Sequence, residues 1–137
     1  DHLTHRAPPL TREAARIADA YTKAWNSGSP EAVASFYALD GGMVINNGTP
    51  WAGRSAVAAM AAGFYADVPN INVVCEQLRY AGDHLAYLWR FTGTHSGTGN
   101  PLNIVGWEEW DMDADHKVKS ARGWFDGEDY ARQVAGS

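Results

Sequence analysis

The stretch that decides the fold is residues 85–95, LAYLWRFTGTH. Every second residue at its start is Leu, Tyr, Trp or Phe, which is the period of a half-buried β-strand. Similar stretches, rich in β-branched and aromatic residues, lie at 71–80, 102–112 and 117–126. The connections between them are short and contain Gly, Asp, Asn or Pro, and such connections join antiparallel neighbours. The sequence therefore predicts a four-stranded antiparallel meander over residues 71–126.

The N-terminal half has helical periodicity instead. After a predicted cap at Thr11, apolar residues recur every three or four positions up to Trp25, and Asn26–Gly28 ends this helix. Ser29 and Pro30 begin a second helix that we expect to run to about Tyr37. We also predict a short strand at 43–46, a third helix at 55–66 and a closing helix at 128–134. Helices gathered on one face of an antiparallel sheet define an α+β fold.

Composition narrows the classes of protein. The 137 residues carry a net charge of −5, and the eleven basic residues are scattered, which argues against nucleic acid as a partner. No apolar run is long enough to span a membrane. A single cysteine, Cys75, cannot form a disulfide framework, so we expect a cytoplasmic protein. No His-x-His or Cys-x-x-Cys spacing occurs, so we expect no metal.

We expect residues 1–10 to be an irregular lead-in and residues 11–137 to be one domain.

Several short motifs occur in this order along the chain: Trp25-Asn26-Ser27-Gly28, Phe36-Tyr37-Ala38, Trp51-Ala52-Gly53-Arg54, Gly93-Thr94-His95-Ser96-Gly97 and Trp124-Phe125-Asp126. With this order of elements, the chain resembles the nuclear transport factor 2-like superfamily over residues 11–134. Within it, the chain is most similar to the SnoaL-like polyketide cyclases. The resemblance implies a cone-shaped, strongly curved sheet, with three helices from the N-terminal half packed on its concave face around a pocket. It also implies chemistry without a cofactor.

Asp126 matches the acid that removes a proton from carbon in those cyclases. By strand alternation it shares a face with Arg122 and Trp124, and an indole beside a carboxylate would raise its pKa. Two other roles stay open for Asp126: it could cap the helix that begins near Gly127, or form an ion pair with Arg122. His95 is a second catalytic candidate, as the partner of Asp126 in an acid–base dyad; alternatively, backbone groups of the following loop satisfy it.

The expected pocket residues lie on the first helix and on the strands. They are Tyr21, Trp25, Asn46, Trp89, Phe91 and Trp124. Tyr21 matches the phenol of ketosteroid isomerases, but it could equally be a core tyrosine. Asn46 stands where the base of those isomerases would be, and an amide cannot accept the proton, so that chemistry is not expected. Gly123 replaces an acid of limonene epoxide hydrolases, which argues against epoxide hydrolysis.

Glu108 and Glu109 are adjacent on a predicted strand and must face opposite sides of the sheet. One of them could enter the pocket beside Trp107 or Trp110, and we expect the other to be solvated.

The leading hypothesis is a cofactor-free enzyme that binds a small hydrophobic carbonyl compound and cyclises or isomerises it with Asp126 as base. The alternatives are a non-catalytic ligand-binding protein, or an interaction module whose pocket is filled by aromatic packing. Large apolar residues on both strand faces, at Trp107/Trp110 and Trp124/Phe125, predict a homodimer through the sheet.

Overall fold

A computed structural model of the chain describes residues 10–137, so the predicted lead-in at 1–10 lies outside the described residues except for Leu10. Leu10 already belongs to the first helix. The elements follow one another as α1 (Leu10–Asn26), α2 (Pro30–Ala34), β1 (Gly42–Ile45), β2 (Trp51–Ala52), α3 (Arg54–Asp67), β3 (Asn72–Ala81), β4 (His84–Thr94), β5 (Pro101–Met112), β6 (Val118–Phe125) and α4 (Gly127–Ala135).

The six strands form one sheet in the order β2-β1-β6-β5-β4-β3. The predicted meander is confirmed, because β3, β4, β5 and β6 pair antiparallel with their neighbours in sequence. The sheet as a whole is mixed, since β1 runs parallel to β6. The short strand β2, which the sequence analysis did not predict, returns against β1 through a turn at Asn46 and Asn47, whose φ angles of 51° and 58° suit such a hairpin.

The helix α2 begins as expected, with the Ser29 hydroxyl accepting a hydrogen bond from the backbone N–H of Ala32 at 3.1 Å. It ends three residues earlier than predicted. The chain tightens there, since the N–H groups of Phe36 and Tyr37 donate to carbonyls only three residues back. Tyr37 then forms a parallel bridge with Val118 at the start of β6, so the predicted last turn of the helix instead joins the sheet.

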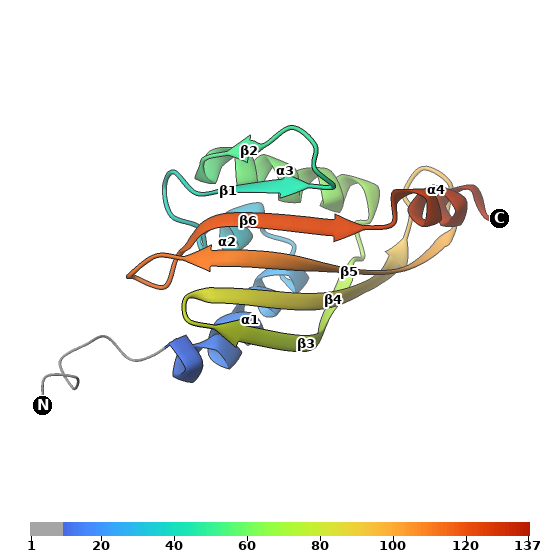
Figure 1. The fold of residues 1–137 in the computed structure, drawn as a ribbon. Coiled ribbons are helices and arrows are strands. Elements are labelled where there is room, and N and C mark those ends of the chain that lie inside the picture. The colour runs from blue at the N-terminus through green and yellow to red at the C-terminus, as the bar shows by residue number, and fades with distance from the viewer. Residues whose placement is uncertain (1–9) are drawn as a thin grey trace, which may run out of the picture.

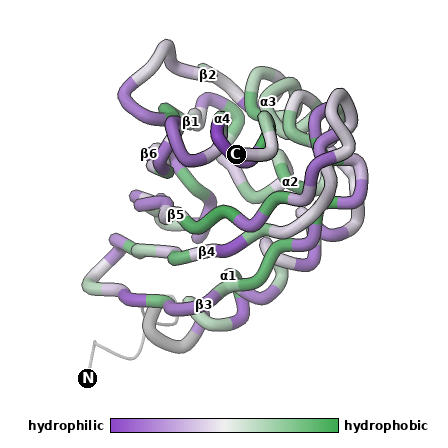
Figure 2. The backbone as a smooth tube through the Cα atoms, turned by 90° about the vertical axis from the view of Figure 1, so that its right-hand side faces the viewer, coloured by the Kyte–Doolittle hydropathy of each residue, from purple (hydrophilic) through white to green (hydrophobic). Residues whose placement is uncertain are grey.

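The helices α1, α2 and α3 lie on one side of the sheet, and α4 lies at one end of it beside β5 (Figures 1 and 2). The core fills the space between the two layers and includes Tyr21, Tyr37, Tyr87 and Trp110, each at most 1% exposed. This is the α+β arrangement predicted from the sequence. In the part of the chain that the structure describes, no helix is long and apolar enough to cross a membrane.

At Gly106, in the middle of β5, a side chain and a backbone carbonyl from the neighbouring strands come very close to the glycine. A Cβ atom at this position would lie 2.5 Å from Cζ2 of Trp89 and 2.5 Å from the carbonyl oxygen of Trp124. Only glycine therefore lets the indole of Trp89 lie across β5.

Replacing glycine by alanine should have opposite effects on stability at Gly106 and at Gly63. Gly106→Ala should lower the free energy of unfolding by about 1–3 kcal/mol, because the new methyl group overlaps a ring and a backbone carbonyl. Gly63→Ala, in α3 where nothing lies within 4 Å of the added atom, should raise it by about 0.5–1 kcal/mol. Urea unfolding of both variants measures this. Equal effects of the two substitutions would contradict the close packing at Gly106.

Candidate functional site

A cavity lies between the inner face of the sheet and the helices α1 and α3. Its volume is about 50 Å³, and the empty space around it, open solvent at the mouth included, amounts to about 540 Å³. The surrounding residues are almost entirely apolar, and six are aromatic besides Trp124: Trp25, Phe64, Tyr87, Trp89, Phe91 and Phe125. The remainder are Met43, Ile45, Met60, Ile71, Val73, Gly123 and one acid, Glu108. The cavity is therefore an aromatic chamber with a single carboxyl group.

Glu108 sits on the inner face of β5, between Tyr87 of β4 and Gly123 of β6. It is only 8% exposed, and it is the one buried charged or polar residue of the core in the described part of the chain. Its side chain lies beside Gly123, where a Cβ would be in ordinary van der Waals contact with Cγ of Glu108, at 3.5 Å. The carboxyl group thus lies on the cavity wall.

Two donors hold one oxygen of this carboxyl group. Oε1 accepts a hydrogen bond from the Tyr21 hydroxyl at 3.0 Å and another from Nε1 of Trp110 at 2.9 Å. Tyr37 lies behind Tyr21, with 3.1 Å between the two hydroxyl oxygens. Since the proton of Tyr21 goes to Glu108, Tyr37 is the donor in that second bond. The chain of hydroxyls thus orients Glu108 from the helical layer.

The second oxygen of Glu108 is the free one. Oε2 accepts no hydrogen bond from the described residues. It is nevertheless not fully buried, because the fully buried polar atoms without a partner do not include it. It therefore retains open space beside it, which for this cavity-lining residue is the cavity.

Burial raises the pKa of Glu108 from 4.5 to about 7, and the hydrogen bonds from Trp110 and Tyr21 only partly oppose this. Near neutral pH the group is therefore divided between its acid and its base form, as a general acid–base catalyst requires. Burial also raises the pKa values of Tyr21 and Tyr37, so both hydroxyls stay protonated and remain donors.

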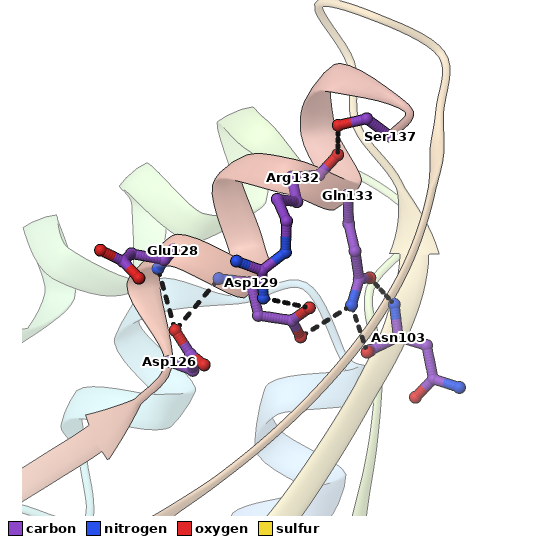
Figure 3. Close-up of polar contacts among 7 residues, drawn as sticks. All are labelled: Asn103, Asp126, Glu128, Asp129, Arg132, Gln133 and Ser137. Atoms are coloured by element: carbon purple, nitrogen blue, oxygen red, sulfur yellow. Dashed lines mark hydrogen bonds and ion pairs between the residues drawn. The ribbon is translucent and has the colours of Figure 1, made fainter.

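The structure places Asp126 outside the cavity, at the N-cap of α4. Its exposed carboxylate accepts hydrogen bonds from the N–H groups of Glu128 and Asp129 at 3.0 and 3.1 Å (Figure 3). This is the helix-cap arrangement that the sequence analysis left open as an alternative to catalysis. Asp126 follows the last residue of β6, so strand alternation no longer determines its direction.

His95 also lies away from the cavity. Its Nδ1 accepts hydrogen bonds from the N–H groups of Gly97 and Thr98, both at 3.2 Å, and so organises the loop after β4. This is the loop-satisfied histidine of the alternative interpretation. Neither His95 nor Asp126 borders the cavity, and the proposed dyad has no geometric support.

Of the expected binding residues, Trp25, Trp89 and Phe91 line the cavity. Tyr21 is fully buried and does not line the cavity, but its hydroxyl donates to Glu108 and its ring packs edge to face against Tyr87, both of which do. Asn46 accepts a hydrogen bond from the N–H of Phe125 at 3.0 Å and extends the contact between β1 and β6. Trp124 borders the cavity, but it pairs in register with Trp107 on the outer face, with ring centroids 5.4 Å apart.

Glu108 was predicted only as one of two acids that could enter the pocket, and not as the base. The signal that could have found it is parity within β5. Glu108 shares its face with the apolar positions Leu102, Ile104, Trp110 and Met112, whereas Glu109 shares a face with Asn103, Trp107 and Asp111. A lone carboxylate among inward-facing apolar residues is the informative feature.

Among the described residues, no group of three or more His, Cys, Asp or Glu side chains is placed to hold a metal ion. The one acid of the cavity would supply a single ligand.

The family of the chain follows from its sequence and fold together. The model of the SnoaL-like domain matches residues 18–121, so the chain belongs to the SnoaL-like domain family, as its motifs indicated. No curated protein matches the chain.

Three solved structures share the fold. One is from Jannaschia sp. CCS1 and is described as a SnoaL-like polyketide cyclase. It has a TM-score of 0.83 and 16% sequence identity, and the match covers 96% of this chain and 97% of that one. A hypothetical protein with a ketosteroid isomerase-like fold from Catenulispora acidiphila, in complex with trimethylamine, has a TM-score of 0.80 at 22% identity, covering 87% and 92%. A protein described as a polyketide cyclase from Bacillus cereus has a TM-score of 0.74 at 22% identity, covering 87% and 78%.

The buried carboxyl group should make stability depend on pH. Because the folded protein holds the Glu108 proton up to about pH 7, whereas the unfolded chain releases it near 4.5, the free energy of unfolding should fall as pH rises between these values. Glu108→Gln keeps an acceptor for Tyr21 and Trp110 but removes the titration. The free energy of unfolding of this variant, minus that of the native protein, should therefore increase by about 3 kcal/mol from acid to neutral pH.

Urea unfolding of both proteins across this pH range measures the difference. Glu109→Gln changes the neighbouring residue on the opposite face and is the matched control. A Glu108→Gln difference that does not vary with pH would contradict a protonated carboxyl group in the core.

Proposed function

We propose that this protein binds a small, largely apolar carbonyl compound in its cavity and moves a proton on it with Glu108 as the acid–base group. Glu108 takes the role that the sequence analysis gave to Asp126. The observation that carries the proposal is a carboxyl group with a raised pKa, one free oxygen and aromatic surroundings.

The reaction would use few groups. Ionised Glu108 accepts a proton from carbon at Oε2, and the electron pair of the broken C–H bond moves toward the substrate's carbonyl oxygen. The protonated group can then return the proton at another position, which is an isomerisation. Alternatively, the enolate carbon adds to a second carbonyl carbon of the same substrate, the π pair of that C=O bond moves to its oxygen, and Glu108 returns the proton to this oxygen, which is a cyclisation. Oε1 stays bound to Tyr21 and Trp110 throughout, so the carboxyl group keeps its direction.

The ring opening of nitrobenzisoxazole, in which a base removes a proton from carbon, tests this role with a flat aromatic probe. The rate should rise with the ionisation of Glu108 and level off above about pH 7. Glu108→Gln should lower the rate by about 10²-fold or more, the contribution expected of a general base. Asp126→Asn is the matched control and should leave it essentially unchanged, because the amide oxygen can still cap α4.

A loss of rate in Asp126→Asn with Glu108→Gln unaffected would return the base to Asp126. A rate no greater than that of acetate in solution would count against any base in the cavity. Mass spectrometry of small molecules that co-purify with the protein would then identify the native ligand.

A second candidate is a non-catalytic ligand-binding protein. The Catenulispora protein with this fold is described in complex with trimethylamine. Aromatic rings around a carboxylate also suit a small alkylammonium ion, which they attract electrostatically. Tight binding of trimethylammonium that depends on Glu108, without proton transfer to any probe, would favour this function.

We further propose that two copies associate through the outer face of the sheet. Three residues on that face remain well exposed, namely Val74 at 47%, Val105 at 50% and Trp107 at 42%. Burying them would remove apolar surface from water. Arg90 lies between Val74 and Val105 in the sheet, where its charge is paired with Glu76 at 2.8 Å.

Light scattering should give the mass of a dimer at micromolar concentration, with a total buried area of at least about 1,200 Å². Trp107→Lys should produce monomers, because a lysine in the middle of the contact is costly to desolvate. Leu39→Lys changes an apolar residue that is 77% exposed away from the sheet face, and it should remain dimeric. A monomeric native protein would refute this association.

A further inference from the structure

One row of paired residues crosses the inner face of the sheet along the cavity. Glu108 of β5 pairs with Tyr87 of β4 on one side and with Gly123 of β6 on the other. Gly123 in turn pairs with Ile45 of β1, and all four residues line the cavity. Three of them border it with side chains, whereas Gly123 has only its backbone to do so. The cavity therefore reaches the backbone of the sheet at the position next to Glu108.

The space over Gly123 accepts one carbon atom without a clash. The nearest neighbours of a Cβ there would be Cγ of Glu108 at 3.5 Å, Sδ of Met43 at 3.6 Å and the carbonyl oxygen of Trp107 at 3.7 Å. All three distances are ordinary van der Waals contacts. Gly106, the inner glycine of β5, is the opposite case, because an indole ring already lies 2.5 Å from its Cβ position. Of these two glycines, only the one beside Glu108 leaves space for an added atom.

The cavity is small enough for one carbon atom to matter. A volume of about 50 Å³ holds only a few water-sized spheres, since one such sphere needs about 10–15 Å³. A methyl group on Gly123 would take a sizeable share of it. Met43 borders the same space with its thioether sulfur and is only 2% exposed, so the length of its side chain limits this space from the other side.

We propose that Gly123 and Met43 determine the size of the carbonyl compound that can reach Glu108, and that the substrates are compact ketones or aldehydes. The inference rests on the proposed function and assigns the residues that select its substrate. An atom over Gly123 touches the Glu108 side chain, so it belongs to the part of the ligand nearest the base. The substrate is therefore measured next to its reacting carbon, between Glu108 and Met43.

The test measures the affinity of four cyclic ketones, from cyclobutanone to cycloheptanone, through the change in tryptophan fluorescence. In the native protein the affinity should rise about fourfold with each added CH₂ group, the gain expected for its burial, and then fall at the first ring that is too large. Gly123→Ala should weaken binding of the tightest ring about fivefold or more, because it forces an extra carbon into a filled space. Smaller rings should bind nearly as before.

Shortening the side chain on the other side of this space should have the reverse effect. Met43→Val removes the sulfur that limits it and places a residue that suits a strand. Binding of the first ring that is too large for the native protein should then improve about fourfold. The double variant Gly123→Ala/Met43→Val should return to the native size limit. If Met43→Val fails to fold, Gly123→Ala decides alone, since its added atom makes only ordinary contacts.

Two substitutions away from the cavity are the matched controls. Gly63→Ala adds the same methyl group in α3, where nothing lies within 4 Å of it. Met112→Val shortens a methionine that is 2% exposed on β5 but does not line the cavity. Both should keep the native size limit. No binding of any ring, an unchanged limit in Gly123→Ala, or a changed limit in Gly63→Ala would each overturn the inference.

Exchange of hydrogen for deuterium on the ketone separates this inference from the proposed function. Glu108 accepts the proton from the carbon beside the carbonyl group, the C–H electron pair forms a C=C bond, and the C=O π pair moves to oxygen. After its proton exchanges with D₂O, Glu108 returns a deuteron to the same carbon. Glu108→Gln should stop this exchange and keep the size limit.

A size limit set by Gly123 with no exchange would refute only the role of Glu108. Exchange that depends on Glu108, with a size limit that Gly123→Ala does not change, would refute only the role of Gly123 and Met43.

Discussion

The structure depends on a carboxyl group that is buried in an apolar sheet face. Glu108 can remain there only because Tyr21 and Trp110 donate hydrogen bonds to it. Tyr21 belongs to α1, so this contact attaches the first helix to the centre of the sheet. Tyr37, from the turn after α2, continues the network at the point where the chain enters the sheet beside Val118. The position of the helical layer and the state of the acid are therefore coupled.

Space for a ligand arises where small and large residues meet on the inner face. Gly106 and Gly123 lack side chains on the strands that flank or carry Glu108, and Trp89 and Met43 reach over them. The large aromatic rings pack edge to face or at an offset, such as Trp25 against Phe64 at 5.9 Å.

Strand alternation gives β5 two electrostatic environments. On the inner face, loss of hydration raises the pKa of Glu108. On the outer face, a hydrogen bond from His84 and the neighbouring Arg122 lower the pKa of Asp111. Two acids three residues apart are thus pushed in opposite directions by burial and by charge. Only the inner acid is divided between its two forms near neutral pH, which is why the proposed chemistry rests on it.

The sequence by itself determined the elements, because periodicity is a local property. It predicted the four-stranded meander, the capped helix at Ser29 and the aromatic character of the cavity around Trp25, Trp89 and Phe91. It could not choose between a base and a helix cap for Asp126, since an aspartate between a strand and a helix fits either role. Only the tertiary structure decided that Asp126 meets the free N–H groups of α4. It also brought Tyr21, 87 positions away in the chain, to the carboxyl group of Glu108, a contact that no local pattern contains.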